Sequence, residues 1–566
     1  MNRREFIMSE NKLSDFVKKY RIECIVMLVY IVGISVISYF HEPWFDEAQA
    51  WQIARSASIK DILFKIPHWE GHPQLWHLLL VPFAKLGAPY LFSLKFVNIV
   101  ICSAAVSLLI FRSPFPKLLR CALPFTYFIF YQYGVLSRPY CIMMLAIFLM
   151  AVTYKNRDEK PLPFVLSMAL LCASQMVGIM IAGMVSVVWM VKTFASHADD
   201  KKAVFKDKRC YALLGLLVIA SVLIISVMPN ADTFNTSFGI TLKERLSESY
   251  RILFLPFEAT WGLCFSYGGI VGGVSLAAKI TECIGGALIL AFFAWYGKKT
   301  HTLSEFFPPF LVLIVFLGIG YSNPHHYGIL TLMMIYYMWI TLEPKGYEAL
   351  RQLAAAFKEK ITSGFVRKLT AVILAAALLM PVAESVVSSV NEVLVPYTYS
   401  RELADFIKEH HLDELKILSE WAWDFDDIES AEIEYMDRKE IKERRNEYVY
   451  LMGVATEVSP YFDKPIFINY GDENGNYLYS QYRKVDKDEA KKTINKWVSK
   501  GMPDVILAEI NLELYYSEED LKKANYVRVA NFERNKVFKF FKEDYSINLY
   551  MRKDLLDKYG LKELPF

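Results

Sequence analysis

Long apolar runs, separated by short polar segments, constrain the fold of this chain more than any other feature. The first run extends from Ile22 to Phe40, and comparable runs follow up to about residue 390 of 566. A helix needs roughly 20 apolar residues to cross the hydrocarbon core of a bilayer, and a soluble core does not need such blocks. Because 54% of the residues are hydrophobic, the pattern predicts an integral membrane protein built mainly from α-helices.

The positions of lysine and arginine predict how the runs cross the membrane, because cytoplasmic loops carry the excess of these residues. They predict a polytopic helical bundle with about eleven crossings. The expected crossings are 22–40, 91–111, 118–134, 140–154, 162–175, 177–191, 211–227, a run ending near 296, 307–321, 327–342 and 369–387. The run Leu75–Leu86 is too short to cross and is expected to be an interfacial or re-entrant helix. The chain is thus expected to be a multi-pass protein of the cell membrane with a cytoplasmic N-terminus.

A change in composition near Pro396 predicts the domain boundary. Residues 1–395 form the expected membrane domain, and 396–566 are charged and aromatic, as in a soluble extracytoplasmic domain. The alternating and helical patterns of the second part predict a small α/β domain. We expect helices at 401–410 and 486–499 and strands at 416–418, 464–469 and 504–507. This part carries no catalytic motif, so either an accessory, acceptor-positioning role or a structural role is expected.

The polar segment between the first two crossings, His41 to His77, is the expected catalytic loop of the outer side. Its ionisable residues are Asp46, Glu47, Arg55, His68, Glu70, His72 and His77. Near a bilayer every such group must be solvated or paired, and intramembrane charges are costly. The loop is therefore better explained as a site than as a connector. An aromatic belt with solvated charges is the alternative, because tryptophans interleave with these residues.

Composition excludes several classes of function. The net charge is only +3, so no nucleic-acid partner is expected, whereas membrane lipids surround the helices. The eight cysteines stand singly, without a CxxC pair, which excludes a cysteine zinc site or a disulfide framework as the organising device. No residue is assigned as a metal ligand and no cofactor is certain. Carboxylates together with imidazoles can nevertheless hold a divalent cation.

Further cations and imidazoles fall on the outer side of the expected topology. They are Lys85, Lys95, Arg138, His325 and His326. A single cation at a lipid boundary is often a snorkelling anchor. Carboxylates, imidazoles and cations on one membrane face together match what transfer from a phosphate-bearing lipid requires: a base for the acceptor proton and fixed cations for the departing phosphate.

Four motifs resemble the GT-C superfamily of polytopic glycosyltransferases, and most of all its protein-mannosyltransferase-like and aminoarabinose-transferase-like branches. They are FDEAQAW, EGHPQLWHLLLVPFAKLG, SLKF and SRPY, which fall within residues 20–190. In these families an acidic pair opens the first outer loop, and Asp46 and Glu47 are its counterparts here. A later arginine near an outer helix end corresponds to Arg138. His72 departs from the usual proline, and His325 and His326 stand where the relatives carry an arginine motif.

The resemblance implies a polyprenyl-phosphate-linked sugar as donor, a glycan, lipid or protein as acceptor, and inversion at the anomeric carbon. It implies Asp46 as the base and Glu47 as the group that orients the acceptor or a cation. The expected substrate-binding residues are Arg55, Glu70, His72, Gln74, His77, Lys85, Lys95, Arg138, Tyr140, His325 and His326. Arg55, Lys85 and Arg138 are expected around the lipid phosphate.

Two other functions fit a polytopic protein. A transporter or lipid flippase usually places ionisable residues in mid-membrane on broken helices and often has repeated halves. The apolar runs here are nearly free of such residues, and the sequence shows no internal repeat. A non-catalytic assembly or sensor protein is the other alternative, and the spacing from the acidic pair to the HPQLW motif argues against it.

Overall fold

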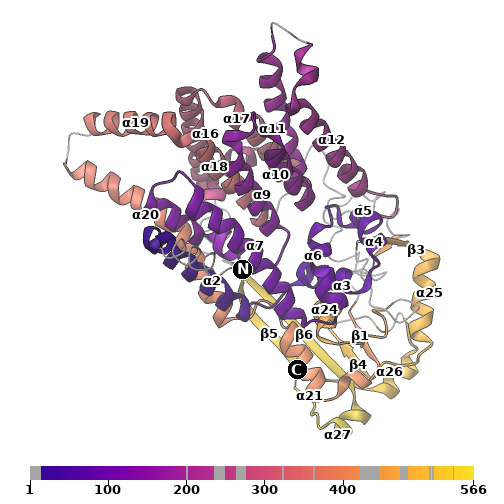
Figure 1. Cartoon of the computed structure of the whole chain (residues 1–566). Coiled ribbons are helices and arrows are strands. Elements are labelled where there is room, and N and C mark those ends of the chain that lie inside the picture. Colours follow the sequence, from indigo (N-terminus) through magenta and orange to yellow (C-terminus); the bar gives the residue numbers. More distant parts are fainter. Residues whose placement is uncertain are drawn as a thin grey trace, which may run out of the picture. The chain divides into compact units, whose positions relative to one another are not determined.

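The computed structural model is mostly helical, with a small sheet near the C-terminus (Figure 1). It describes residues 15–198, 202–234, 249–262, 276–320, 324–360, 364–420, 447–449, 452–471, 482–508, 512, 515–538 and 541–565. The chain divides into two compact units. The first contains Met1–Phe40, Lys95–Ala220 and Tyr250–Val390. The second contains His41–Leu94, Ser221–Ser249 and Asn391–Phe566, so the polar segment 41–77 groups with the C-terminal domain rather than with the helices that flank it.

Within the described residues, six helices are long and apolar enough to cross a membrane. They are α2 (Arg21–Phe40), α7 (Tyr90–Arg112), α11 (Met176–Ala195), α12 (Lys208–Val227), the part Lys279–Thr300 of α16 (Leu276–Thr300) and the part Ala375–Leu394 of α20 (Gly364–Leu394). This number is smaller than the eleven crossings expected. All six coincide with expected crossings, whereas the other five expected crossings are shorter or broken helices.

The expected crossing 118–134 shows why the count falls. Helix α8 (Lys117–Ala122) is followed by a 3-10 turn containing Pro124, and Thr126 is extended before a short π-helix at Phe128–Gln132. Proline lacks the N–H that would continue the helix ladder, so the run breaks there. The other four contain shorter helices, namely α9 (Tyr140–Thr153), α10 (Pro161–Ser174), α17 (Leu303–Val315) and α18 (Gly328–Thr341).

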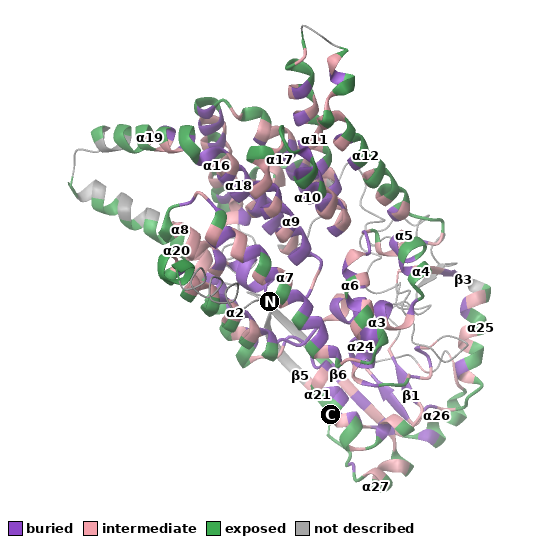
Figure 2. Ribbon diagram, in the orientation of Figure 1, coloured by how far each residue is buried: buried purple, intermediate pink, exposed green. Residues whose placement is uncertain are grey.

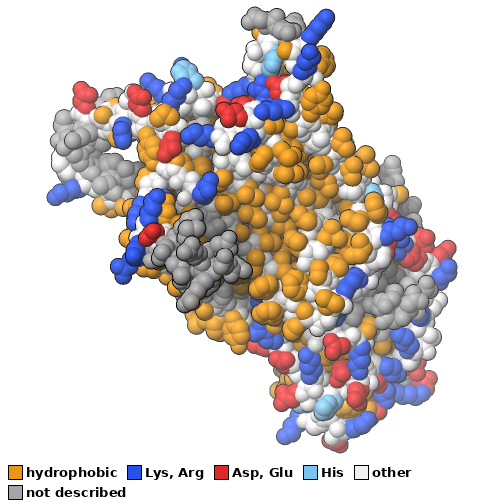
Figure 3. Space-filling model, in the orientation of Figure 1, with side chains coloured by type: hydrophobic (Ala, Val, Ile, Leu, Met, Phe, Trp, Pro, Cys, Tyr) orange, Lys and Arg blue, Asp and Glu red, His pale blue; other side chains and the backbone are white. Residues whose placement is uncertain are grey.

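The first unit packs its shorter helices inside and exposes apolar side chains on longer ones (Figure 2). Helices α9 and α18 pack on each other, and most of their residues are buried. Apolar side chains of α2 and α12 point outward, among them Ile25, Leu28, Leu214, Leu217 and Val218. Figure 3 shows hydrophobic side chains spread over the helices in view. Such a surface is unusual for a soluble protein and fits contact with lipid.

The sheet of the second unit has the strand order β1-β4-β6-β5. Strands β1 (Ile417–Ser419) and β4 (Val505–Leu507) are parallel, and β6 (Phe541–Arg552) runs antiparallel to β4 and to β5 (Tyr526–Phe538). Helices α21 (Ser400–Glu409) and α25 (Lys487–Val498) confirm the two expected helices. The expected strand 464–469 is wrong as a full strand. It makes one parallel bridge to β1 through Phe467, and Pro465 in its middle cannot donate to a ladder.

The polar segment 41–77 folds into four short helices of the second unit, the last of which extends beyond it. They are α3 (Phe45–Ser56), α4 (Ile59–Phe64), α5 (Ile66–Glu70) and α6 (Leu75–Lys85). With 11 residues, α6 confirms that the run after His72 is too short to cross. Helix α3 packs against α6 on one side and against α24 (Gly453–Val458) of the C-terminal domain on another. The loop and the domain therefore share one packed interior.

Candidate functional site

The N-terminal end of α3 is held by a buried triad of ionisable groups. His41 Nε2 lies 2.8 Å from Glu47 Oε2, and its Nδ1 lies 2.9 Å from Glu392 Oε1. The side chains of His41 and Glu47 have no exposed surface, and that of Glu392 is 1% exposed. The Glu47 carboxylate also accepts from the Trp44 backbone N–H at 3.3 Å. A glutamate in the first turn that reaches back to the start of its helix is a common N-terminal cap.

The two carboxylates keep the His41 ring protonated. Burial alone favours the neutral ring, but the charges of Glu47 and Glu392 and their hydrogen bonds outweigh it and raise the pKa of His41 from 6.5 to about 9. Both ring nitrogens then donate, as the geometry requires. Glu47 therefore has its carboxylate turned to an imidazolium inside the protein, where it positions α3.

Asp46 has a different environment although it is the next residue. Its side chain is half-buried, and the Tyr482 hydroxyl donates to its Oδ1 at 3.5 Å. The Phe45 and Tyr482 rings also meet edge to face, with centroids 6.2 Å apart. Adjacent residues on a helix point about 100° apart, so one acid reaches the buried triad while the other stays near the surface of α3.

A turn rich in polar groups lies on the same face of α3 as Asp46. Gln49, three residues after Asp46, shares that face, and its Nε2 donates to Glu70 Oε1 at 3.3 Å. The Glu70 carboxylate lies 3.9 Å from His72 Nε2, and the rings of His72 and His77 stack at 5.7 Å. We call Asp46, Gln49, Glu70, His72 and His77 the acid–histidine cluster.

The backbone between α5 and α6 makes this cluster possible. Gly71 has φ +68°, the left-handed conformation that ends α5 and that glycine adopts at little cost. Gln74 then turns back, and its Nε2 donates to the His72 carbonyl oxygen at 2.9 Å. The expected site residues Glu70, His72, Gln74 and His77 are thus brought together by one turn.

Three buried polar atoms in the same packed layer have no hydrogen-bond partner among the described residues. They are Gln52 Nε2, Gln74 Oε1 and Trp76 Nε1. Buried polar groups are almost always paired, and an orphan calls for water or a ligand. These atoms are interior polar groups of the second unit that no described residue satisfies.

At the C-terminal end of α3, the cations Arg55 and Lys85 donate to carbonyl oxygens of the protein. The Arg55 guanidinium donates to Gln52 Oε1 at 2.6 and 3.1 Å and to the carbonyl oxygens of Phe462 at 2.9 Å and Ser459 at 3.3 Å. Lys85 Nζ donates to the Ala57 carbonyl at 2.7 Å. Helix ends leave carbonyls without partners, and cations satisfy them. The expected phosphate ligands Arg55 and Lys85 are instead committed to the backbone of the second unit.

The first unit contains the other expected site residues. The Arg138 guanidinium lies over the Tyr140 ring at 5.9 Å, and the Tyr140 ring meets those of His325 at 5.8 Å and His326 at 6.2 Å. The Tyr133 hydroxyl donates to the His325 carbonyl at 2.9 Å, which fixes the turn that carries both histidines. Residues almost 190 positions apart thus form one group, which we call the arginine–histidine cluster.

Lys95 belongs to the first unit as well. Its side chain is buried, and it lies three residues before Asn98 on α7. The Asn98 amide donates to the Gly134 carbonyl at 2.9 Å and to that of Tyr133 at 3.3 Å. Because Lys95 shares this face of α7, it points toward the bend that precedes Arg138.

The described residues contain no group of three or more histidine, cysteine, aspartate or glutamate side chains arranged to hold a metal ion. The triad of His41, Glu47 and Glu392 contains the right residue types. However, an imidazolium between two carboxylates has no lone pair for a metal. Near His325 and His326 the described part of the first unit supplies Arg138, and Arg251 donates to the hydroxyl of the neighbouring Tyr327 at 3.4 Å.

Sequence reasoning missed three residues of this region. Glu392 joins the triad from the end of α20, 351 positions after His41, and only a charged residue in an apolar helix signalled it. Tyr482 covers Asp46 from the C-terminal domain. Gln49 had a findable signal, because it follows Asp46 by one helical turn within FDEAQAW.

No protein-family model, curated protein sequence or solved structure matches this chain. The resemblance to the GT-C superfamily therefore stands on the motifs, and the function is argued from the geometry of the two clusters.

Proposed function

We propose that this chain is a membrane glycosyltransferase that moves a sugar from a polyprenyl-phosphate-linked donor to a hydroxyl of a glycan, lipid or protein acceptor on the extracytoplasmic side. The motifs that resemble the GT-C superfamily support the proposal. The structure supports it further, because the residues of these motifs fall into two polar clusters with complementary chemistry.

The observation that carries the proposal is the contrast between Asp46 and Glu47. Glu47 is fully buried against a protonated His41, whereas Asp46 is half-buried at the edge of the acid–histidine cluster. A general base must reach the proton that it removes. Asp46 is therefore assigned as the base, and Glu47 is reassigned from acceptor contact to positioning.

In the proposed reaction the Asp46 carboxylate takes the proton of the acceptor hydroxyl while the acceptor oxygen attacks the anomeric carbon. The bond from that carbon to the phosphate oxygen breaks, and the polyprenyl phosphate leaves with the electron pair. Attack opposite the leaving group inverts the anomeric carbon. Glu70 and His72, whose side chains are partly exposed, hold the acceptor's other hydroxyls.

The leaving phosphate needs fixed positive charge. Arg55 and Lys85 are engaged with backbone carbonyls, so we assign this role to the arginine–histidine cluster and Lys95. A guanidinium offers paired N–H donors that match a phosphate. Tyr140 supports the arginine by lying under it, and His325 and His326 stand beside the ring.

The second unit also supports an odd number of crossings. Helix α2 ends at Phe40, directly before this unit begins, and residues beyond α12 are bonded within the unit: His68 Nδ1 donates to the Met228 carbonyl at 2.6 Å, and Phe234 N–H donates to the Tyr482 carbonyl at 2.8 Å. We infer that the ends of α2, α12 and α20 lie on one side of the membrane, because the second unit contains the residues that follow each of them. The six long helices alone would place the end of α12 opposite that of α2, so the proposed topology includes an odd number of shorter crossings between α7 and α12.

This topology predicts that the termini lie on opposite sides. Lys117→Cys and Lys523→Cys, both at exposed lysines, would be introduced singly into a cysteine-free variant in intact cells. A membrane-impermeant maleimide should label position 523 and reach position 117 only after the membrane is permeabilised. Labelling of both positions in intact cells would contradict the topology.

The activity itself can be tested in membranes that contain the protein. They would be incubated with radiolabelled polyprenyl-phosphate sugars and separated into glycan, lipid and protein fractions. The proposal expects the label to leave the donor lipid and to appear in one fraction, with membranes lacking the protein as control. Label that crosses the bilayer while still attached to its lipid would indicate a flippase and contradict the proposal.

A further inference from the structure

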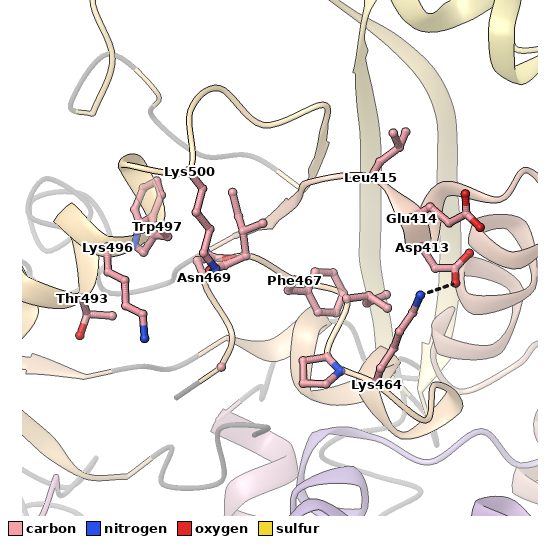
Figure 4. Close-up of a pocket in the computed structure, with 14 residues that line it drawn as sticks. Asp413, Glu414, Leu415, Lys464, Phe467, Asn469, Thr493, Lys496, Trp497 and Lys500 are labelled. Carbon is pink, nitrogen blue, oxygen red and sulfur yellow. Dashed lines mark hydrogen bonds and ion pairs between the residues drawn. The ribbon is translucent and has the colours of Figure 1, made fainter. Parts of the chain in front are cut away.

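The C-terminal domain contains a cavity of about 530 Å³ that the proposed transfer reaction does not use (Figure 4). It lies between the end of α25 and the segment Lys464–Asn469. Cavities of roughly 300–1,000 Å³ are typical of small-molecule sites, so this volume suits one or two sugar rings.

The floor of the cavity is rigid. Ile468 N–H donates to the Ile417 carbonyl at 2.8 Å. The Asn469 amide bonds to the Ser419 backbone in both directions, at 3.0 and 2.8 Å. Phe467 is buried beneath. The segment is thus tied to β1, and the cavity is preformed.

The two sides of the cavity carry opposite charges. Figure 4 shows Thr493, Lys496 and Trp497 on one side and Asp413, Glu414 and Lys464 on the other. Lys464 Nζ pairs with Asp413 at 3.5 Å. No ion pair or hydrogen bond of the Lys496 or Glu414 side chain is found among the described residues. One side therefore offers a cation and the other an acceptor carboxylate.

The lining also contains an orphan donor. Trp497 is 2% exposed, and its indole Nε1 has no hydrogen-bond partner among the described residues. Its ring packs on Tyr515 at 4.8 Å, which holds the indole in place. Buried indole N–H groups usually have a partner. Lys500 Nζ donates to the Ile468 carbonyl at 3.4 Å, which ties the end of α25 to the floor of the cavity.

We propose that this cavity binds an acid-bearing sugar unit, with its carboxylate or phosphate at Lys496 and its hydroxyls donating to Asp413 and Glu414. A saccharide fits because it combines many hydroxyl donors with one anion in a rigid body of this size. A simple anion would leave the Glu414 carboxylate without a donor. That the sugar belongs to the acceptor glycan rests on the proposed function, but binding to the cavity does not.

The test uses the purified full-length protein in detergent and needs no donor. Saturation-transfer NMR and calorimetry would measure binding of a glucuronate-containing disaccharide, of its neutral analogue with the acid reduced to an alcohol, of inorganic phosphate and of a tetraglutamate peptide. The acidic disaccharide should bind at least about tenfold more tightly than each of the other three, because a charged hydrogen bond contributes that much. Equal binding of the neutral sugar, phosphate or the peptide would overturn the proposal.

Two lysines of the same helix provide the matched comparison. Lys496→Glu should weaken binding of the acidic disaccharide about tenfold or more. Lys491→Glu makes the same charge change at an exposed position that does not line the cavity, and it should leave binding unchanged. An equal loss in both variants would show a general charge effect and overturn the site. Binding that persists while no sugar is transferred would contradict only the proposed function.

Discussion

At its N-terminal end, α3 holds Asp46 half-buried beside the Tyr482 hydroxyl, whereas at its C-terminal end the Arg55 guanidinium donates to Gln52 and to two backbone carbonyls. Both residues lie in one 12-residue helix and both are ionisable. Asp46 keeps part of its side chain exposed, whereas the Arg55 guanidinium is engaged by the protein. Charge at a membrane boundary is therefore not sufficient evidence for a catalytic role.

The difference follows from the polarity of a helix. The N-terminal end exposes N–H groups, so carboxylates there can be stabilised without being consumed, and Glu47 already serves the start of the helix. The C-terminal end exposes carbonyls, which cations must satisfy. Lys85 does so at the end of α3, where it donates to the Ala57 carbonyl, and Arg55 satisfies two carbonyls that follow α24. Carbonyls at helix ends thus engage both cations, whereas Asp46 at the N-terminal end of α3 remains half-buried.

The largest effect is expected on turnover, from a substitution at the N-terminal end of α3. Asp46→Asn keeps the shape of the side chain and removes its basicity, so turnover should fall about 10²–10⁴-fold while donor binding persists. Asp61→Asn is the matched control, because Asp61 also lies in a first helical turn of the loop but is bonded to Ser58. Near-normal turnover of purified Asp46→Asn would show that Asp46 is not the general base, and Glu70 or His72 would be the next candidates.

The buried triad predicts a dependence of stability on pH. Because folding raises the pKa of His41 from 6.5 to about 9, its stabilisation is complete below pH 6.5 and is lost as the pH rises through 9. The unfolding temperature of the wild type should therefore fall between pH 7 and pH 10. The free energy of unfolding of His41→Gln should be lower at pH 7 by roughly 2–3 kcal/mol. Its unfolding temperature should also change less between pH 7 and pH 10.

The control for the triad is His197→Gln. His197 lies 3.6 Å from a single carboxylate, that of Asp207, and is partly exposed, so it should change neither the stability at pH 7 nor the pH profile appreciably. If His41→Gln keeps the wild-type decline between pH 7 and pH 10, another group titrates and the triad does not position α3.

The same contrast can be made in the first unit between two arginines that lie over tyrosine rings. Arg157 lies 3.7 Å above Tyr154 and donates to the Tyr154 carbonyl at 2.9 Å, whereas Arg138 lies beside His325 and His326 over Tyr140. Arg138→Ala should raise the KM for the lipid-linked donor about tenfold or more. Arg157→Ala should not. If both variant proteins are present at normal abundance and have the same KM for the donor, Arg138 is a snorkelling cation at the lipid boundary and not a phosphate ligand.

The smallest effect is expected on the free energy of unfolding, from a substitution at the C-terminal end of α3. Arg55→Ala removes hydrogen bonds to Ser459 and Phe462, so the unfolding free energy should fall by about 1–3 kcal/mol without a change in donor affinity. Lys65→Ala removes only an exposed pair with Asp61 and should have little effect. A loss of donor affinity at unchanged stability would make Arg55 a phosphate ligand and break the comparison.

Local sequence patterns were sufficient where the structure is local. The apolar runs predicted α2, α7 and α12, and the short run after His72 predicted α6. The turn that gathers Glu70, His72 and His77 follows from Gly71 and Pro73. The eleven expected crossings failed as continuous helices where prolines such as Pro124 interrupt the run, because hydropathy averages over a break that one residue makes.

Long-range pairings could not be predicted in this way. Glu392 meets His41 and Tyr482 meets Asp46 only after the C-terminal domain has packed on the loop. The hairpin of β5 and β6 was also missed, although the alternation from Tyr526 to Phe532 is a strand signal. The same packing brings the Arg55 guanidinium to the carbonyl oxygens of Ser459 and Phe462, and no sequence pattern indicated these contacts.

The most direct test of the account is a single turnover of the purified protein with a polyprenyl-phosphate sugar and an acceptor glycan, followed by mass spectrometry of both products. The proposed transfer reaction predicts equal amounts of free polyprenyl phosphate and of acceptor carrying one added sugar with inverted anomeric configuration. Both products should be lost in Asp46→Asn but not in Asp61→Asn. Sugar transfer that is equally fast in Asp46→Asn, or that retains the anomeric configuration, would contradict it.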